Sequence, residues 1–99
     1  MYTATMRYYF KQEYFEQACE TWNSVVFKLA RKQPGFVRMQ FLTQNEEGIA
    51  LAIGTWKSQE DAQNFMKTGV FKELLNDLRN VTLKTPEPEI WNLKYFGED

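Results

Sequence analysis

The spacing of apolar side chains along this chain switches between about two and about 3.6 residues, and the order of these switches limits the possible folds. Residues 2–10 (YTATMRYYF) alternate with a period of two, which predicts a half-buried strand. Residues 12–33 have apolar side chains at helical spacing, and Pro34-Gly35 ends this helix. The strand should direct one set of side chains to the core and a second set away from it. The first set is Tyr2, Ala4, Met6, Tyr8 and Phe10, and the second is Thr3, Thr5, Arg7 and Tyr9.

The middle of the chain indicates two strands followed by a second helix. Residues 36–44 and 49–57 are strand-like, and the segment NEEG between them is typical of a hairpin turn. Ser58 is expected to cap the second helix by accepting a hydrogen bond from the amide of Asp61. Gly69 is expected to interrupt this helix midway.

The last part of the chain predicts a final strand. An irregular segment follows Arg79, and Pro86 and Pro88 then precede EIWNLKYF, residues 89–96. Side chains of this strand should alternate between faces, with one side carrying Trp91, Leu93 and Tyr95.

The resulting order of strand, helix, strand, strand, helix, strand is typical of the α+β ferredoxin-like fold (βαββαβ). This fold is a four-stranded antiparallel sheet with two helices on one face, so the other face of the sheet is uncovered. The mixed polar and aromatic residues expected on that face suit contact with a second sheet. A core built from 99 residues is small and often gains from oligomerisation. We therefore predict one domain over residues 1–99 that forms a homodimer.

The composition argues against several classes of function. Twelve basic and 13 acidic residues give a net charge of −1 without charge runs, so neither nucleic acid nor a membrane surface is an expected partner. The chain has no histidine and one cysteine, which removes the usual ligands of zinc, copper and haem iron. We expect no cofactor and no metal. The N-terminal residues do not resemble a signal peptide, and a single cysteine fits a reducing compartment, so the expected location is the cytoplasm.

Two segments carry a resemblance to a known family. They are QPGFVRMQFL, residues 33–42, and TWKSQEDAQNFMKTGVFKELLNDLR, residues 55–79. Both resemble the antibiotic-biosynthesis-monooxygenase family of the dimeric α/β barrel superfamily. The resemblance implies two subunits that stack their open sheet faces into a barrel, with an apolar pocket between sheet and helices in each subunit. It also implies activities that include metal-free oxidation of aromatic compounds, haem degradation and the handling of small quinones.

The pattern is most similar to the haem-degrading branch, but the functional residues of that branch are missing. The branch uses an asparagine on the first strand, and a tryptophan and a histidine on the second helix. In this chain Phe65 stands at the position of that tryptophan and Leu75 at the position of that histidine, and the first strand has no asparagine. The chain is therefore not expected to be a haem oxygenase.

Trp56 is the main candidate for a ligand-binding residue, because it ends the third strand on a face otherwise made of small side chains. These are Ala50, Ala52 and Gly54. Small residues either admit a closely packed helix or leave a cavity. In the first case Trp56 only fills the strand–helix junction. In the second case it forms the wall of a pocket, since an indole offers a large apolar surface and one hydrogen-bond donor.

If the cavity exists, the resemblance implies that Phe65 and Leu75 border it together with Trp56. Tyr8 or Arg7 would then supply its few polar contacts, and such a pocket suits a small aromatic ligand. Arg7 has an alternative role in an ion pair, either with Glu89 or with a partner subunit. No catalytic residue can be assigned.

Three functions remain open at the level of the sequence. The first is a cofactor-independent monooxygenase acting on a small aromatic or quinone-type substrate. The second is a non-catalytic homodimer that binds or senses a small hydrophobic ligand. The third is a structural dimer with a filled core. Cys19 lies in the apolar stripe of the first helix, where an inert buried thiol is expected rather than a redox site.

Overall fold

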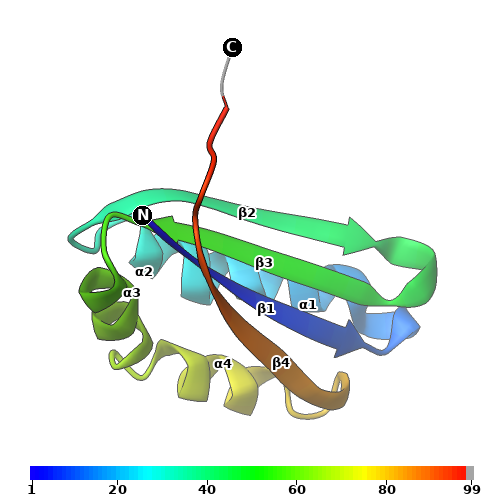
Figure 1. Cartoon of the computed structure of the whole chain (residues 1–99). Helices are drawn as coiled ribbons and strands as arrows, with labels where there is room; N and C mark the ends of the chain where they lie inside the picture. The colour runs from blue at the N-terminus through cyan, green and yellow to red at the C-terminus, as the bar shows by residue number, and fades with distance from the viewer. Residues whose placement is uncertain (98–99) are drawn as a thin grey trace.

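The computed structural model describes residues 1–97 as a four-stranded antiparallel sheet with helices covering one face (Figure 1). The strands lie in the order β2-β3-β1-β4, with all three pairings antiparallel. They are β1 (Tyr2–Phe10), β2 (Phe36–Gln44), β3 (Ile49–Trp56) and β4 (Thr82–Asn92). This architecture confirms the predicted α+β ferredoxin-like fold.

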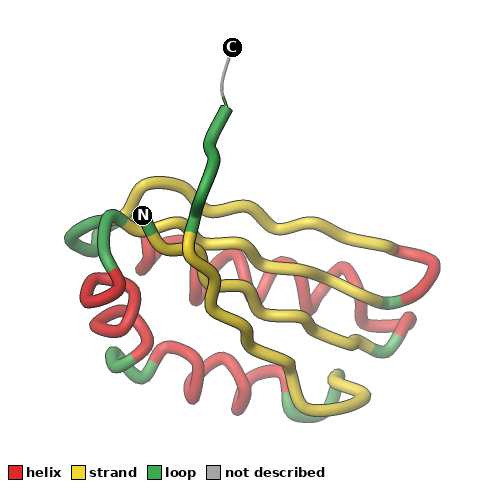
Figure 2. The backbone as a smooth tube through the Cα atoms, viewed as in Figure 1, coloured by secondary structure: helices red, strands yellow, loops and turns green. Residues whose placement is uncertain are grey.

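The segments of the two predicted helices lie on one side of the sheet (Figure 2). The first predicted helix is a continuous run of η1 (Gln12–Tyr14), α1 (Phe15–Trp22), η2 (Asn23–Phe27) and α2 (Lys28–Ala30), in which η2 is π-helical. The hairpin turn holds the short 3₁₀ segment η3 (Asn45–Glu47). The second predicted helix consists of α3 (Gln59–Met66) and α4 (Val70–Leu78). Among residues 1–97, no helix has the length and apolar character needed to cross a membrane.

The start of α3 and the break after it both follow the sequence-based predictions. Asp61 donates its backbone N–H to Ser58 Oγ at 3.1 Å, and the Ser58 hydroxyl donates to the Asp61 carboxylate at 3.0 Å. The N-cap therefore satisfies one of the free amides of the first turn of α3. Gly69 separates α3 from α4 with a φ of 85°, a left-handed conformation that favours glycine. Both predictions are confirmed.

The strand register decides which side chains reach the core. Residues paired across neighbouring strands share a face, and Tyr8 pairs with Ala50 while Phe41 pairs with Ala52. These side chains face the helices, as the alternation in residues 2–10 predicted for Tyr8 and Phe10. The core between sheet and helices is completed by Phe15, Ala18, Trp22, Val26, Ala30, Trp56, Ala62, Phe65, Val70, Leu74 and Leu78.

The last strand differs from the sequence-based expectation at both ends. β4 starts at Thr82 rather than near Glu89, and it ends at Asn92. It includes both prolines because it is an edge strand, where a missing backbone N–H leaves no sheet hydrogen bond unmade. The register with β1 shifts between the pairs of Arg7 and Tyr9, so Pro86 falls in a bulge.

Candidate functional site

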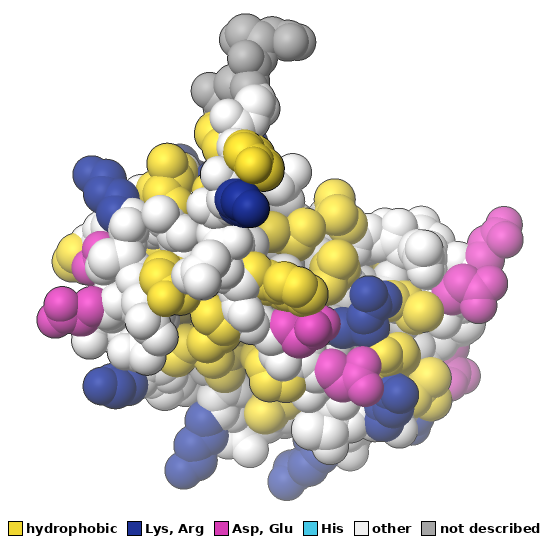
Figure 3. All heavy atoms as spheres, viewed as in Figure 1, with side chains coloured by type: hydrophobic (Ala, Val, Ile, Leu, Met, Phe, Trp, Pro, Cys, Tyr) yellow, Lys and Arg dark blue, Asp and Glu magenta, His cyan; other side chains and the backbone are white. Residues whose placement is uncertain are grey.

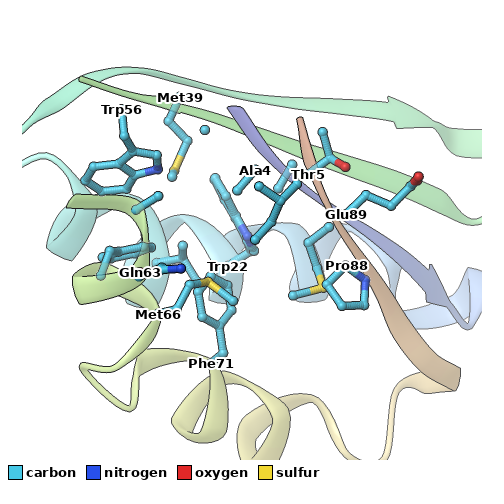
Figure 4. A pocket seen from close by; sticks show the side chains of 17 residues that line it. Ala4, Thr5, Trp22, Met39, Trp56, Gln63, Met66, Phe71, Pro88 and Glu89 are labelled. Atoms are coloured by element: carbon cyan, nitrogen blue, oxygen red, sulfur yellow. The ribbon is translucent and has the colours of Figure 1, made fainter. Parts of the chain in front are cut away.

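An apolar cavity of about 80 Å³ lies between the sheet and the helices, beneath α3 (Figure 4). Its floor is formed by Ala52 and Gly54 of β3 and by Ala4 and Met6 of β1, whose small or flexible side chains leave space under the helix. The sequence left open whether a helix packs closely on the small residues of β3 or a cavity remains there. Both occur, since α3 packs over these residues and a cavity remains beneath it. The rest of the lining is made by Thr5, Trp22, Val26, Met39, Trp56, Ala62, Gln63, Phe65, Met66, Phe71, Pro88, Glu89 and Ile90.

Trp56 forms one end of this cavity and also packs the strand–helix junction. Its side chain is 1% exposed, and its ring lies 4.9 Å from that of Phe65 and 5.7 Å from that of Phe36, measured between centroids. Figure 4 shows the indole nitrogen directed toward the cavity. Gly54 makes this position possible, because a Cβ there would lie 2.9 Å from Met39 Cε and 3.3 Å from Trp56 Nε1.

The cavity reaches the surface between α3 and the edge strand β4. Met66 at the end of α3 is 38% exposed, and Ile90 of β4 is also exposed, so both lie at its mouth. Ile90 and Pro88 pair with Ala4 and Met6, which places them on the helix-facing side of the sheet. A methionine at the mouth can change rotamer at little cost and so adjust the width of the opening.

Two buried polar groups near the cavity lack partners. Among the described residues, neither the Trp22 indole N–H nor the Tyr8 hydroxyl makes a hydrogen bond of standard length and angle, although the two groups are neighbours. Burial raises the pKa of Tyr8 strongly, and the neighbouring Trp22 side chain opposes this rise, so the phenol remains protonated at any ordinary pH. Trp22 lines the cavity, whereas Tyr8 lies beside its wall.

The structure brings together two of the five residues predicted for the pocket. Trp56 and Phe65 line the cavity, but Leu75, Tyr8 and Arg7 do not. Leu75 is 43% exposed, because Leu74 is the residue of α4 that points into the core. Whether Trp56 and Phe65 bind a ligand stays a prediction.

Arg7 lies on the other face of the sheet from the cavity. The alternation of β1 directs it to the open face, where it lies opposite Glu87 in the strand register, while Glu89, the expected ion-pair partner, lies opposite Thr5. A hydrogen bond from Tyr9 is the main cause that lowers the pKa of Glu87, with smaller contributions from Lys84 and Arg7. Arg7 thus belongs to an exposed polar group on the sheet and cannot contact a molecule in the cavity of its own chain.

Sequence reasoning missed most of the lining, including Trp22, Met39, Gln63 and Met66. Trp22 was assigned to the apolar stripe of the first helix, which is correct but does not reveal that it borders a cavity. A second hollow of about 240 Å³ lies on its other side and is also lined by Cys19, Asn23, Phe27, Met39 and Phe41. Burial, followed by Glu16 and Glu20, raises the pKa of Cys19 to about 11, so this thiol is protonated at neutral pH.

The comparison with family models decides the relationship of this chain to known proteins. Residues 1–76 match the model described as antibiotic biosynthesis monooxygenase. The chain belongs to this family. None of the curated proteins compared with it matches significantly.

Solved structures of the antibiotic biosynthesis monooxygenase family share the fold over nearly the whole chain. A putative antibiotic biosynthesis monooxygenase from Nitrosomonas europaea is 16% identical, with a TM-score of 0.82 over 96% of this chain and 100% of that one. SnoaB, a cofactor-independent oxygenase from Streptomyces nogalater, is 19% identical, with a TM-score of 0.71 over 96% of this chain and 94% of that one. The ActVA-Orf6 monooxygenase of Streptomyces coelicolor, solved with the ligand nanaomycin D, is 15% identical, with a TM-score of 0.81 over 99% of this chain and 91% of that one.

Within this family the haem-degrading branch was the most similar in pattern, and the structure places its two helix positions differently. Phe65 lies in the cavity wall, whereas Leu75 lies outside it. Among residues 1–97, no three side chains of the His, Cys, Asp and Glu types gather as a metal site would require. The side chains that face the cavity therefore offer aromatic and aliphatic surface, two indole N–H groups and one amide, whereas Thr5 and Glu89 alternate with the helix-facing Ala4 and Met6 pairs and belong to the open face of the sheet.

Proposed function

We propose that this chain binds a small aromatic or quinone-type compound in the cavity beneath α3 and oxidises it with molecular oxygen, without a cofactor. The observation that carries the proposal is the apolar lining, in which Trp56, Phe65 and Phe71 supply aromatic surface around a floor of small residues. Membership of the monooxygenase family supports the reaction type. Further support comes from two structural neighbours, one described as a cofactor-independent oxygenase and one as a monooxygenase with a bound ligand.

The volume of the cavity favours compounds of about one ring. A dry cavity of roughly 150 Å³ holds benzene in an engineered protein, and the cavity here has about 80 Å³. Entry of a ring therefore requires side chains to move. Met39 and Met66 line opposite parts of the cavity and have flexible thioether side chains, so they are the residues we expect to yield.

The chemistry of the lining limits the substrates that could be oxidised. Glu89 is the one ionisable residue among the described residues of the lining, and Figure 4 shows its carboxylate turned away from the cavity. No side chain there can act as a general base. The substrate must therefore ionise readily by itself, as a hydroquinone or an acidic phenol does, and must supply the electrons that reduce oxygen.

The same lack of a base favours a second candidate function. A homodimer that binds or senses a small hydrophobic compound without turnover needs only the apolar lining and a few orienting groups. Binding and oxidation share one cavity and differ only in the reaction with oxygen.

We further propose that the chain is one domain that works as a homodimer in the cytoplasm. The open face of the sheet carries exposed apolar residues, and Figure 3 displays such side chains across this face. Leu42 of β2 is 47% exposed, and Trp91 of β4 and Phe96 beyond it are also exposed. A second sheet stacked on this face would remove these side chains from water.

Oxygen uptake by the purified protein tests the proposed reaction. Phenolic and hydroquinone compounds of one or two rings would be incubated with the protein, and the uncatalysed oxygen uptake would be subtracted. We expect catalysed uptake by the wild-type chain and much lower uptake by Gly54→Ala, in which the added methyl group narrows the cavity. Binding measured by calorimetry without oxygen uptake would support the second function. Neither binding nor uptake would contradict both.

A further inference from the structure

Trp22 combines nearly complete burial with an unused hydrogen-bond donor. Its side chain is 3% exposed, and its Nε1–H makes no hydrogen bond of standard length and angle with any described residue, although it lies near the Tyr8 hydroxyl. A buried N–H without a partner is rare in folded proteins, because the group loses its hydrogen bond to water and gains nothing in return. Such a group is a candidate for contact with a bound molecule.

The local structure fixes this indole firmly. Trp22 is the last residue of α1, and the π-helical segment η2 begins directly after it. Single π-helical turns are frequent at functional sites. The indole stacks on Phe41 with centroids 4.3 Å apart and an interplanar angle of 25°, and on Phe27 at 6.3 Å and 15°. The ring is thus held between two aromatic neighbours, and its orientation is set before anything binds.

Trp22 is part of the cavity lining. Figure 4 shows Trp22 in the middle of the lining, between Trp56 on one side and Pro88 on the other. Trp22 and Met39 also line the second hollow, so these two side chains form the partition between the two spaces. Since Met39 has no donor, the Trp22 N–H is the polar group of this partition.

We propose that Trp22 determines the specificity of the cavity by donating its Nε1–H to a carbonyl or phenolate oxygen of the bound aromatic compound. This inference rests on the proposed function, because it assumes that the cavity binds aromatic compounds. An indole can donate but cannot accept a hydrogen bond, so the arrangement favours compounds that present an acceptor. Pure hydrocarbons of the same shape leave the donor unpaired and bind more weakly.

A spectroscopic test uses the unmodified chain with two probes of equal shape. Acetophenone carries a carbonyl oxygen where α-methylstyrene carries a CH₂ group, so both produce similar ring effects and only one accepts a hydrogen bond. The three tryptophans give three indole signals in a ¹H–¹⁵N spectrum, and the signal absent from Trp22→Phe assigns Trp22. We expect this signal to move downfield with acetophenone and not with α-methylstyrene. If Trp22→Phe fails to fold, the contacts of the indole proton with the Phe41 ring assign the signal.

An affinity cycle provides the second measurement. The ratio of the two dissociation constants is measured for the wild type and for Trp22→Phe, so the cost of removing the carbonyl from water cancels between the proteins. One neutral hydrogen bond corresponds to a preference for acetophenone about three- to tenfold larger in the wild type. Tyr8→Phe is the second variant, because it removes the hydroxyl near the Trp22 N–H while keeping its ring. This variant should retain or enlarge the wild-type ratio, because the Trp22 donor is kept.

The outcomes separate the inference from the function on which it rests. If neither probe binds the wild type, the proposed function and the role of Trp22 both fail. If both probes bind, but the ratio is the same in Trp22→Phe or is lost in Tyr8→Phe instead, the role of Trp22 is overturned and aromatic binding stands. A Trp22 indole signal that shifts equally with both probes would also overturn the role of Trp22 and leave aromatic binding intact.

Discussion

Trp56 at the end of β3 and Phe65 near the end of α3 pack with their ring centroids 4.9 Å apart and an interplanar angle of 31°. The two rings join the sheet to the helix that roofs the cavity. The contact explains why a large indole stands at a strand–helix junction, since Trp56 fills the junction with one side and borders empty space with the other. Packing and lining are two consequences of one position.

The first prediction concerns Trp56→Phe. The smaller ring keeps an aromatic contact with Phe65 but loses buried surface, so we expect the free energy of unfolding to fall by about 1–2 kcal/mol. Urea denaturation measures this change. Leu75→Ala is the control, because Leu75 is 43% exposed on the outer side of α4 and its truncation should change stability by less than about 0.5 kcal/mol. Equal effects of the two substitutions would contradict the assigned role of Trp56.

The second prediction concerns the floor of the cavity. In Gly54→Ala the added Cβ meets Met39 Cε at 2.9 Å, but this methyl is the end of a flexible side chain and can move into the remaining space. We expect the free energy of unfolding to change by less than about 1 kcal/mol, while affinity for one-ring aromatic compounds falls about tenfold or more.

Gly69→Ala provides the control for this substitution. Its added Cβ meets nothing within 4 Å, but its φ of 85° strains any residue with a side chain. It should therefore lower stability by about 1 kcal/mol and leave affinity unchanged. If Gly54→Ala instead binds one-ring aromatic compounds as tightly as the wild type, ligands do not occupy this cavity.

Sequence patterns predicted the β1, β2 and β3 strands well because burial on one face imposes a clear period of two. β4 was placed too late because prolines were read as a barrier, although an edge strand accepts them. The lining of the cavity was harder to predict. A helical stripe identifies Trp22 as buried, but only the packing of neighbouring elements decides whether a buried residue borders a void.

The same reasoning explains why Leu75 lies outside the cavity. Its assignment to the pocket followed from a family position, whereas the glycine break before α4 starts a new helix whose direction the sequence does not specify. The result places Leu74 and Leu78 in the core and turns Leu75 outward. Arg7 was a simpler case, because the alternation of β1 already put it on the face opposite Tyr8.

The third prediction concerns the cap of α3. Ser58→Ala removes the acceptor of the Asp61 amide and should lower the free energy of unfolding by about 1 kcal/mol. Ser58→Thr keeps a hydroxyl at this position and should lose clearly less. Urea denaturation of the two variants compares them directly, and an equal loss in both would show that the hydrogen bond adds nothing.

The fourth prediction concerns the reactivity of Cys19. Its pKa of about 11, against an ordinary value of 9.0, lowers the thiolate fraction at neutral pH by roughly a hundredfold. Alkylation by iodoacetamide should therefore be slow in the folded protein and should accelerate as the pH rises toward 11. The same chain in urea is the control and should react at the rate of a free cysteine. Fast alkylation of the folded chain at pH 7 would disprove the assignment of an inert thiol.

The last prediction compares two leucines of similar exposure on opposite sides of the molecule. Leu42 is 47% exposed and pairs with Leu51 on the open face of the sheet, whereas Leu75 is 43% exposed on α4. If two sheets stack through their open faces, Leu42→Glu buries a carboxylate without a partner, and this charge disfavours the dimer strongly. Leu75→Glu places the same charge in water.

Sedimentation at micromolar concentration distinguishes the two cases. The wild type and Leu75→Glu should sediment with twice the 11.8 kDa mass of one chain, and Leu42→Glu should sediment as a monomer that remains folded by circular dichroism. A monomeric wild type would exclude the homodimer. A dimer that Leu75→Glu dissociates and Leu42→Glu leaves intact would move the interface to the helices, where it would cover the outer face of α4 instead of the sheet.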